Sequence, residues 1–162
     1  MEIKDKELHR IVTTCLIYKP GLQYLVTKRA VHKMVMPGKW TIPGGGLDID
    51  DYINTPPSTK GANQWYGALE NSLRREIKEE VNLEIGKPEF LIDLTFIRPD
   101  GIPVLCLSYF TPYISGKVKL DEDATDFKWI SVSEIQNYDF IEGIDEEIKM
   151  VDEILKKRQS VW

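Results

Sequence analysis

The sequence predicts an α/β protein of the α+β type, in which a mixed or antiparallel β-sheet packs against helices. Strand-like segments come before, between and after the helical ones, and several adjacent strands are joined by short turns, as in hairpins. A doubly wound parallel sheet would instead place a helix between most consecutive strands. The 162 residues, with 42% hydrophobic and 29% charged residues, suit one domain with a real core.

Five segments have the apolar or alternating pattern of strands. They cover residues 10–18, 22–29, 89–97, 102–114 and 125–130, and a short apolar piece at 40–46 enters three glycines. Lys-Pro-Gly separates the first two strand segments, and Arg-Pro-Asp-Gly separates the third from the fourth. Both are typical turn sequences, so we expect two hairpins.

Helical patterns appear in three places. We expect a helix over about 64–81, a short helix capped by Ser131 or Ser133, and an amphipathic C-terminal helix. The apolar stripe of the C-terminal helix consists of Ile144, Ile148, Val151 and Leu155. Residues 47–63 are acidic at first and then rich in Pro, Ser, Thr, Gly and Asn, which predicts a long loop. Such loops are uncommon inside a compact domain and often carry function.

Charge and composition exclude several classes of protein. The net charge of −5 disfavours non-specific binding to nucleic acid, which depends on phosphate neutralisation. No apolar run approaches the roughly 20 residues of a membrane span, and the charged N-terminus lacks a signal core. Cys15 and Cys106 each lie in an apolar run, so we expect buried thiols. These features predict a cytoplasmic protein.

Residues 74–82, Arg-Arg-Glu-Ile-Lys-Glu-Glu-Val-Asn, hold three glutamates within five positions. Projected at about 100° per residue, the apolar stripe of the 64–81 helix continues into these acids. The residues within this arc of about 120° are Trp65, Leu69, Leu73, Glu76, Glu79 and Glu80, with Ile77 and Val81 on its flank. A solvated acidic face would lie opposite the apolar stripe. The acids are therefore expected to meet whatever packs against the helix.

Three carboxylates at this spacing repel one another, and partial burial would raise their pKa values. A divalent cation removes both costs. Oxygen ligands with no nearby His or Cys suit Mg²⁺, or Mn²⁺ as the alternative. From the residues alone, a salt-bridged helix remains the competing interpretation.

Three stretches carry a family resemblance: Arg-Glu-Ile-Lys-Glu-Glu-Val-Asn-Leu at 75–83, Lys-Trp-Thr-Ile-Pro-Gly-Gly-Gly at 39–46, and Asp-Phe-Lys-Trp-Ile-Ser-Val-Ser-Glu-Ile at 126–135. Together they resemble the Nudix hydrolases, the MutT-like pyrophosphohydrolases. The box motif of that family is Gly, five residues, Glu, seven residues, then Arg-Glu-aliphatic-x-Glu-Glu-x-Gly-aliphatic. The resemblance spans about residues 10–140 and implies the Nudix fold, a mixed sheet sandwiched between helices, as a single domain over 1–162.

The chain departs from the motif in three ways. Asn82 replaces the glycine after the helix, where asparagine is the next best left-handed residue. Gly67 stands where the box has its first Glu, whose implied role is to support the loop through the box arginine. Residues 47–63 look like an insertion, and because Gly61 lies six before Gly67, the spacing can be counted from either glycine segment. The insertion would cover the pocket, widen it, or bind a second subunit, which leaves a homodimer open.

The resemblance implies a site on the 64–81 helix. Glu76, Glu79 and Glu80 are the expected metal ligands, and Glu76 or Glu79 is the expected catalytic base. The carbonyl of Gly44 is expected to add a metal ligand, and Gly44 and Gly45 to contact substrate, with a plain turn as the alternative.

Two further site residues come from elsewhere in the chain. The resemblance implies an additional acid before the Trp129 strand, where Glu122 and Asp123 are candidates and the spacing to Trp129 favours Asp123 as a metal ligand. Arg29, at a strand end, lies where the family often has an arginine that contacts phosphate or base, so the resemblance implies a substrate contact, with an ordinary exposed arginine as the alternative.

The implied activity is Mg²⁺-dependent hydrolysis of the pyrophosphate linkage in a nucleoside diphosphate derivative. The leading hypothesis is that the substrate is a nucleoside triphosphate, an oxidised or non-standard one included, which is hydrolysed to the monophosphate and pyrophosphate. An ADP-ribose or nucleotide-sugar hydrolase is the second hypothesis, since that branch tends to carry a proline near Pro99. A catalytically silent domain that senses a nucleotide is the third. The expected partner is a small nucleotide, not a nucleic-acid polymer or a membrane.

Overall fold

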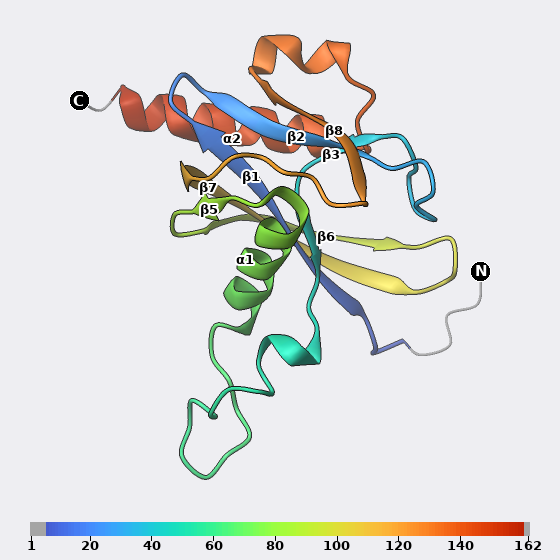
Figure 1. Cartoon of the computed structure of the whole chain (residues 1–162), viewed down its shortest axis with the longest axis vertical. Helices are drawn as coiled ribbons and strands as arrows, with labels where there is room; N and C mark the ends of the chain where they lie inside the picture. Colours follow the sequence, from blue (N-terminus) through green and yellow to red (C-terminus); the bar gives the residue numbers. More distant parts are fainter. Residues whose placement is uncertain (1–5, 161–162) are drawn as a thin grey trace.

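A computed structural model describes residues 6–160, so both ends of the expected 1–162 domain lie outside the described part of the chain. Its elements are shown in Figure 1. They are β1 (Arg10–Lys19), β2 (Gln23–Arg29), β3 (Trp40–Thr41), β4 (Gly44–Gly46), the 3-10 turn η1 (Ile49–Asp51), α1 (Ala68–Val81), β5 (Glu84–Ile85), β6 (Glu89–Ile97), β7 (Pro103–Ser115), β8 (Ala124–Ile130), the 3-10 helix η2 (Val132–Asn137) and α2 (Ile144–Gln159).

The sheet is mixed, as predicted. β1 runs parallel to β7, with Arg10 opposite Val104 and Tyr18 opposite Pro112. The other pairs of named strands are antiparallel: β1 with β2 and β4, β2 with β3 and β8, and β7 with β5 and β6. β1 therefore lies in the middle of the sheet, between the strand that carries the three glycines and the long β7.

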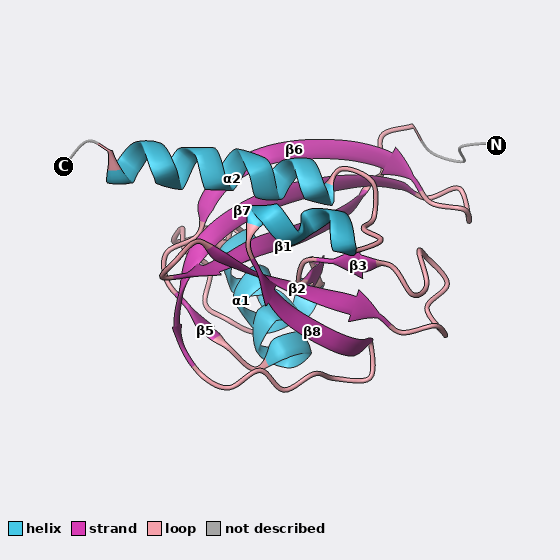
Figure 2. Cartoon of the chain, turned by 90° about the horizontal axis from the view of Figure 1, so that it is seen from above, coloured by secondary structure: helices cyan, strands magenta, loops and turns pink. Residues whose placement is uncertain are grey.

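Helices cover the two faces of this sheet, which confirms the predicted sandwich (Figure 2). Successive strand residues point to opposite faces. Leu16 in β1 accordingly joins the core cluster under α2, whereas Cys15 and Ile17 join the cluster under α1. The stripe predicted for the C-terminal helix is buried as expected, and no helix in the described residues is long and apolar enough to cross a membrane.

The structure corrects the start of the helix expected at residue 64. α1 begins at Ala68, and Gly67 is its N-cap with a left-handed φ of +76°. Trp65 instead belongs to the preceding loop, where its ring lies 5.4 Å from that of Tyr52 and its Nε1 donates to the carbonyl of Thr55 at 2.9 Å. The helical projection failed here because a glycine in this conformation interrupts the helix.

Three smaller differences concern extended and 3-10 segments. The piece expected over 40–46 is divided into β3 and β4, and the short strand β5 has too few residues to show periodicity. The short helix after β8 is a 3-10 helix whose N-cap is Ser131. Both cysteines are buried free thiols, as expected.

Candidate functional site

The glycine strand β4 lies directly against the C-terminal half of α1. The backbone N–H of Gly44 donates to Oε2 of Glu80 at 2.9 Å. At Gly45, an added Cβ would come within 2.2 Å of the Glu76 carboxyl carbon. β4 is held in turn by antiparallel pairing with the central strand β1. Glycine is required at both positions, because a Cβ at Gly44 would overlap the backbone of Thr13 and Thr14, and one at Gly45 would overlap the Glu76 carboxyl group.

The three glutamates of α1 do not share one environment. The Glu76 side chain is 16% exposed, whereas that of Glu79 is 58% exposed. The buried stripe of the helix consists of Leu73, Ile77 and Val81. The predicted arc was therefore rotated: Ile77 and Val81, placed on its flank, lie at its centre. Glu76 and Glu80 border the core, and Glu79 faces outward and pairs with Arg75, as in the salt-bridged interpretation.

The electrostatics of Glu80 and Glu76 reflect this position. Burial raises the pKa of Glu80 to about 8, against the opposing effect of its hydrogen bond from Gly44, and the nearby charges of Glu76, Asp121 and Asp123 add to the rise. Burial also raises the pKa of Glu76, although Arg75 opposes the change. Burial therefore disfavours the ionised form of both carboxyl groups, and a cation placed beside them would oppose that effect.

Arg75 connects the helix to two other parts of the site and contacts two of the helix's own glutamates. Its Nε lies 2.5 Å from Oδ1 of Asp51 and its Nη2 lies 3.1 Å from Oδ2, so the two side chains form a bidentate ion pair. Nη2 also donates to the carbonyl of Gly46 at 3.1 Å, and Nη1 lies 3.0 Å from Glu76 and 2.9 Å from Glu79. The Asp51 side chain is 2% exposed, and its bond to Arg75 lowers its pKa to about 2.

Asp51, rather than an acid at position 67, is thus the partner of the box arginine. Gly67 makes no side-chain cap bond, and a Cβ there would meet nothing within 4 Å. Asp51 lies six residues after Gly45, which is the spacing of Gly and Glu in the box motif. Counting forward from Gly45 would have found Asp51, whereas counting back from Arg75 led to Gly67.

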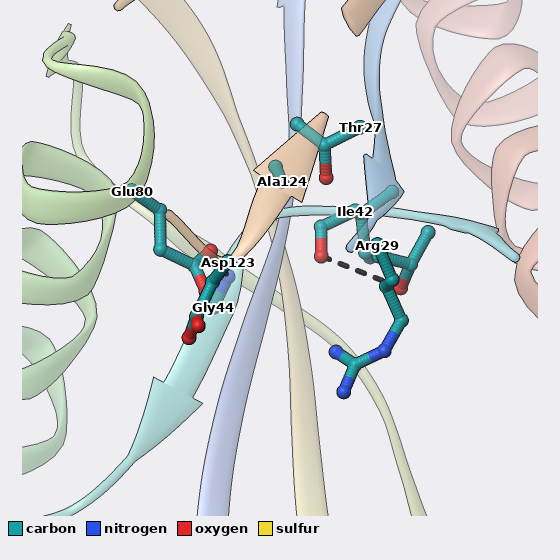
Figure 3. A pocket seen from close by; sticks show the side chains of 8 residues that line it. Thr27, Arg29, Ile42, Gly44, Glu80, Asp123 and Ala124 are labelled. Carbon is teal, nitrogen blue, oxygen red and sulfur yellow. Dashed lines mark hydrogen bonds between the residues drawn. The ribbon is translucent and has the colours of Figure 1, made fainter. Parts of the chain in front are cut away.

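A second wall of the site comes from β2 and the start of β8. Figure 3 shows Glu80 and Asp123 close together beside Gly44, with the Arg29 side chain extending on another side of the same small hollow. The residues that line it are Thr27, Arg29, Thr41, Ile42, Gly44, Glu80, Asp123 and Ala124. Glu122, the alternative to Asp123, is not among them. Arg29 is half-buried, and its Nε donates to the carbonyl of Val35 at 2.9 Å.

Each candidate ligand already has a partner within the protein. Glu80 accepts from Gly44, Glu76 and Glu79 contact Arg75, and the Asp123 carboxylate contacts the ammonium of Lys33. Within residues 6–160, no three His, Cys, Asp or Glu side chains converge closely enough to hold a metal ion as they stand. The carboxylate oxygens suit a hard divalent cation by chemistry, but its binding must exchange some of these contacts.

Comparisons with known proteins place this arrangement in a family. A family model described as the NUDIX domain matches residues 8–150. The nucleoside triphosphatase NudI of Klebsiella pneumoniae (strain 342) is 28% identical over 136 residues, which cover 80% of this chain and 87% of that protein. NudI of Escherichia coli (strain K12) is 29% identical over 140 residues, with the same coverage of 80% and 87%.

Solved structures share the fold at low sequence identity. The MutT protein from Methanosarcina mazei Go1 has a TM-score of 0.69 and 18% identity, covering 94% of this chain and 99% of that one. The NUDIX domain of Shewanella oneidensis NrtR, complexed with ADP ribose, has a TM-score of 0.70 and 15% identity, covering 96% and 94%. The chain therefore belongs to the NUDIX family, which confirms the resemblance, and is a hydrolase of pyrophosphate bonds.

Proposed function

We propose that this protein hydrolyses a nucleoside triphosphate to the monophosphate and pyrophosphate, with Mg²⁺, or Mn²⁺ in its place, as cofactor. The observation that carries this proposal is the grouping of Glu80 and Asp123 beside Gly44 and Arg29, next to Glu76. Its relatives at 28–29% identity are nucleoside triphosphatases, which supports the choice of substrate class.

The donors at the site fit a hard divalent ion. Glu76, Glu80, Asp123 and the carbonyl of Gly44 would hold it, with Glu79 as a further ligand. When bound, such an ion polarises the pyrophosphate oxygens and neutralises charge that develops as water attacks phosphorus. Glu80 and Asp123 line the same hollow, and a cation held between them would favour the ionised form of Glu80 that burial disfavours.

The remaining steps use side chains of the chain itself. Arg29 lies in the same hollow and would contact the phosphates or the base with its guanidinium. Glu76 or Glu79 would accept the proton of the attacking water, and Arg75 holds both carboxylates in position. Gly44 and Gly45 would let the phosphate chain approach the backbone closely, because they carry no side chain.

A substrate panel tests the proposal. Purified protein with Mg²⁺ should release pyrophosphate from at least one nucleoside triphosphate, and Glu80→Gln should abolish the release without loss of folding. Turnover of ADP-ribose or a nucleotide sugar alone would instead favour the second substrate class. Pro99 gives that class no added support, since it lies in a tight turn closed by Gly101 N–H donating to the Arg98 carbonyl at 2.9 Å. Tight nucleotide binding without any turnover would indicate a sensor.

A further inference from the structure

Lys33 lies at the edge of the candidate site, on the loop between β2 and β3. Its ammonium contacts Oδ2 of Asp123. The backbone of this loop is tied to the same residue, because the N–H of Ala30 donates to the Asp123 carbonyl at 2.8 Å. The N–H of Lys33 donates in turn to the carbonyl of Ala30 at 3.2 Å, which closes a turn. The position of Lys33 beside Asp123 is therefore set by backbone contacts as well as by the ion pair.

A cation that binds Asp123 must compete with this ammonium. Asp123 lines the hollow together with Glu80 and Gly44, so an ion held there takes the carboxylate that Lys33 now contacts. The Lys33 side chain is 26% exposed and is carried on a flexible four-carbon stem. Once displaced from Asp123, an ammonium on this stem would still lie close to the hollow that Asp123 lines.

We propose that Lys33 exchanges partners during binding: it neutralises Asp123 first, is displaced by the divalent cation, and then contacts the phosphate chain of the substrate. This inference rests on the proposed function, because it needs both the cation and the phosphorylated substrate. It adds a substrate-contacting residue that lies outside the box helix and outside the glycine strand.

The exchange of partners predicts that Lys33→Met raises the affinity for Mn²⁺ and lowers the affinity for a phosphate ligand. Loss of the competing charge should tighten binding of Mn²⁺ alone, by about three-fold for a partly exposed ion pair. Loss of a charged phosphate contact should weaken binding of imidodiphosphate, a pyrophosphate analogue with NH in the bridge, by about ten-fold in the presence of saturating Mn²⁺. A purely structural ion pair would move neither affinity, or would lower both.

Free Mn²⁺ is measured by electron paramagnetic resonance and imidodiphosphate binding by calorimetry, on the full chain. Lys39→Met is the matched control, since Lys39 lies at the other end of the same loop and pairs with Asp139 at 2.5 Å outside the hollow. It should change neither affinity. Lys33→Arg should keep the affinity for imidodiphosphate within about two-fold, because it retains the charge.

The outcomes separate this inference from the proposed function. If the wild type binds Mn²⁺ and Glu80→Gln weakens that binding, the metal site stands. An unchanged or weaker Mn²⁺ affinity in Lys33→Met, or unchanged imidodiphosphate binding, then overturns the role of Lys33 alone. If the wild type binds no Mn²⁺, both proposals are overturned together.

Discussion

Both carboxylate oxygens of Asp51 accept hydrogen bonds from the Arg75 guanidinium: Oδ1 from Nε at 2.5 Å and Oδ2 from Nη2 at 3.1 Å. This pair joins the turn after the glycine strand to the helix that carries the glutamates. The turn itself is a capping box, in which Asp51 also accepts from the N–H of Asp48 at 2.8 Å. Arg75 is thereby held where it contacts Glu76 and Glu79, so Asp51 acts on the site through Arg75.

Asp51→Asn should lower the free energy of unfolding by about 2 kcal/mol at pH 7, because the carboxylate is buried and its pKa is about 2 in the folded state. The folded-state pKa is depressed, so this stabilisation is present above pH 4 and is lost as pH falls toward 2. Urea unfolding at pH 7, 5, 4 and 3 measures the decrease. The neighbouring Asp50→Asn, at an exposed position, is the control, and an equal loss in both variants would contradict the buried ion pair.

Gly67→Glu should leave activity unimproved, although it places an acid where counting back from Arg75 expects one. Arg75 already has Asp51 as its partner, and φ of +76° at Gly67 makes any side chain there cost about 1 kcal/mol. Turnover and thermal melting of the variant measure both effects. Recovery of activity in the double variant Asp51→Asn with Gly67→Glu would show that position 67 does serve the arginine.

Gly45→Ala should reduce kcat by about 100-fold, because an added Cβ would overlap the Glu76 carboxyl group and move it. The protein should stay folded, since the end of the Glu76 side chain can shift. Gly38→Ala is a useful comparison: its Cβ would meet nothing within 4 Å, so it should cost stability through its φ of +72° but leave kcat within a few-fold. Equal kcat values for the two variants would argue against a role for Glu76.

Substitution of the α1 glutamates by glutamine should affect stability differently at buried and exposed positions. Glu80→Gln should abolish turnover yet be at least as stable as the wild type, because it replaces a carboxyl group whose ionised form is disfavoured by burial. Glu79→Gln changes an exposed side chain, so its effect on stability should be under about 0.5 kcal/mol, and any large loss of kcat then reports catalysis. Glu84→Gln, exposed and paired with Lys78 at 2.8 Å, controls for surface charge. Full activity in Glu80→Gln would refute the site.

The loop after Asp51 should tolerate a shortening that spares this residue. The rings of Tyr52 and Trp65 lie 5.4 Å apart, so residues 53–64 can be replaced by a short glycine turn. If the loop covers the pocket or binds a second subunit, KM or the mass by light scattering will change; otherwise both stay as in the wild type. Deletion of 47–60 should cost far more activity, because it removes Asp51. Equal effects of the two deletions would contradict the importance of Asp51.

Much of the fold was predictable because the strands, helices and turns follow from patterns of residues close together in the sequence. The long strands and the stripe of α2 follow from alternation and helical period, and the turns from Pro and Gly. The site was predictable in part, because Glu76 and Glu80 lie on one helix and Gly44 and Gly45 on one short strand. The orientation of that helix was less certain: Glu79 and Trp65 were assigned to the buried arc, and the packed core chose Ile77 and Val81 instead.

The sequence by itself determined the mixed α+β class, the family and the helix that bears the acids, since these follow from patterns within short stretches of the chain. Only the tertiary structure decided which distant groups meet them. Asp51 pairs with Arg75 across a long loop, and Lys33 pairs with Asp123, which is distant from it in the sequence. The reason is physical: buried and half-buried charges must find partners through space, and spacing along the sequence does not limit which partner the fold brings near.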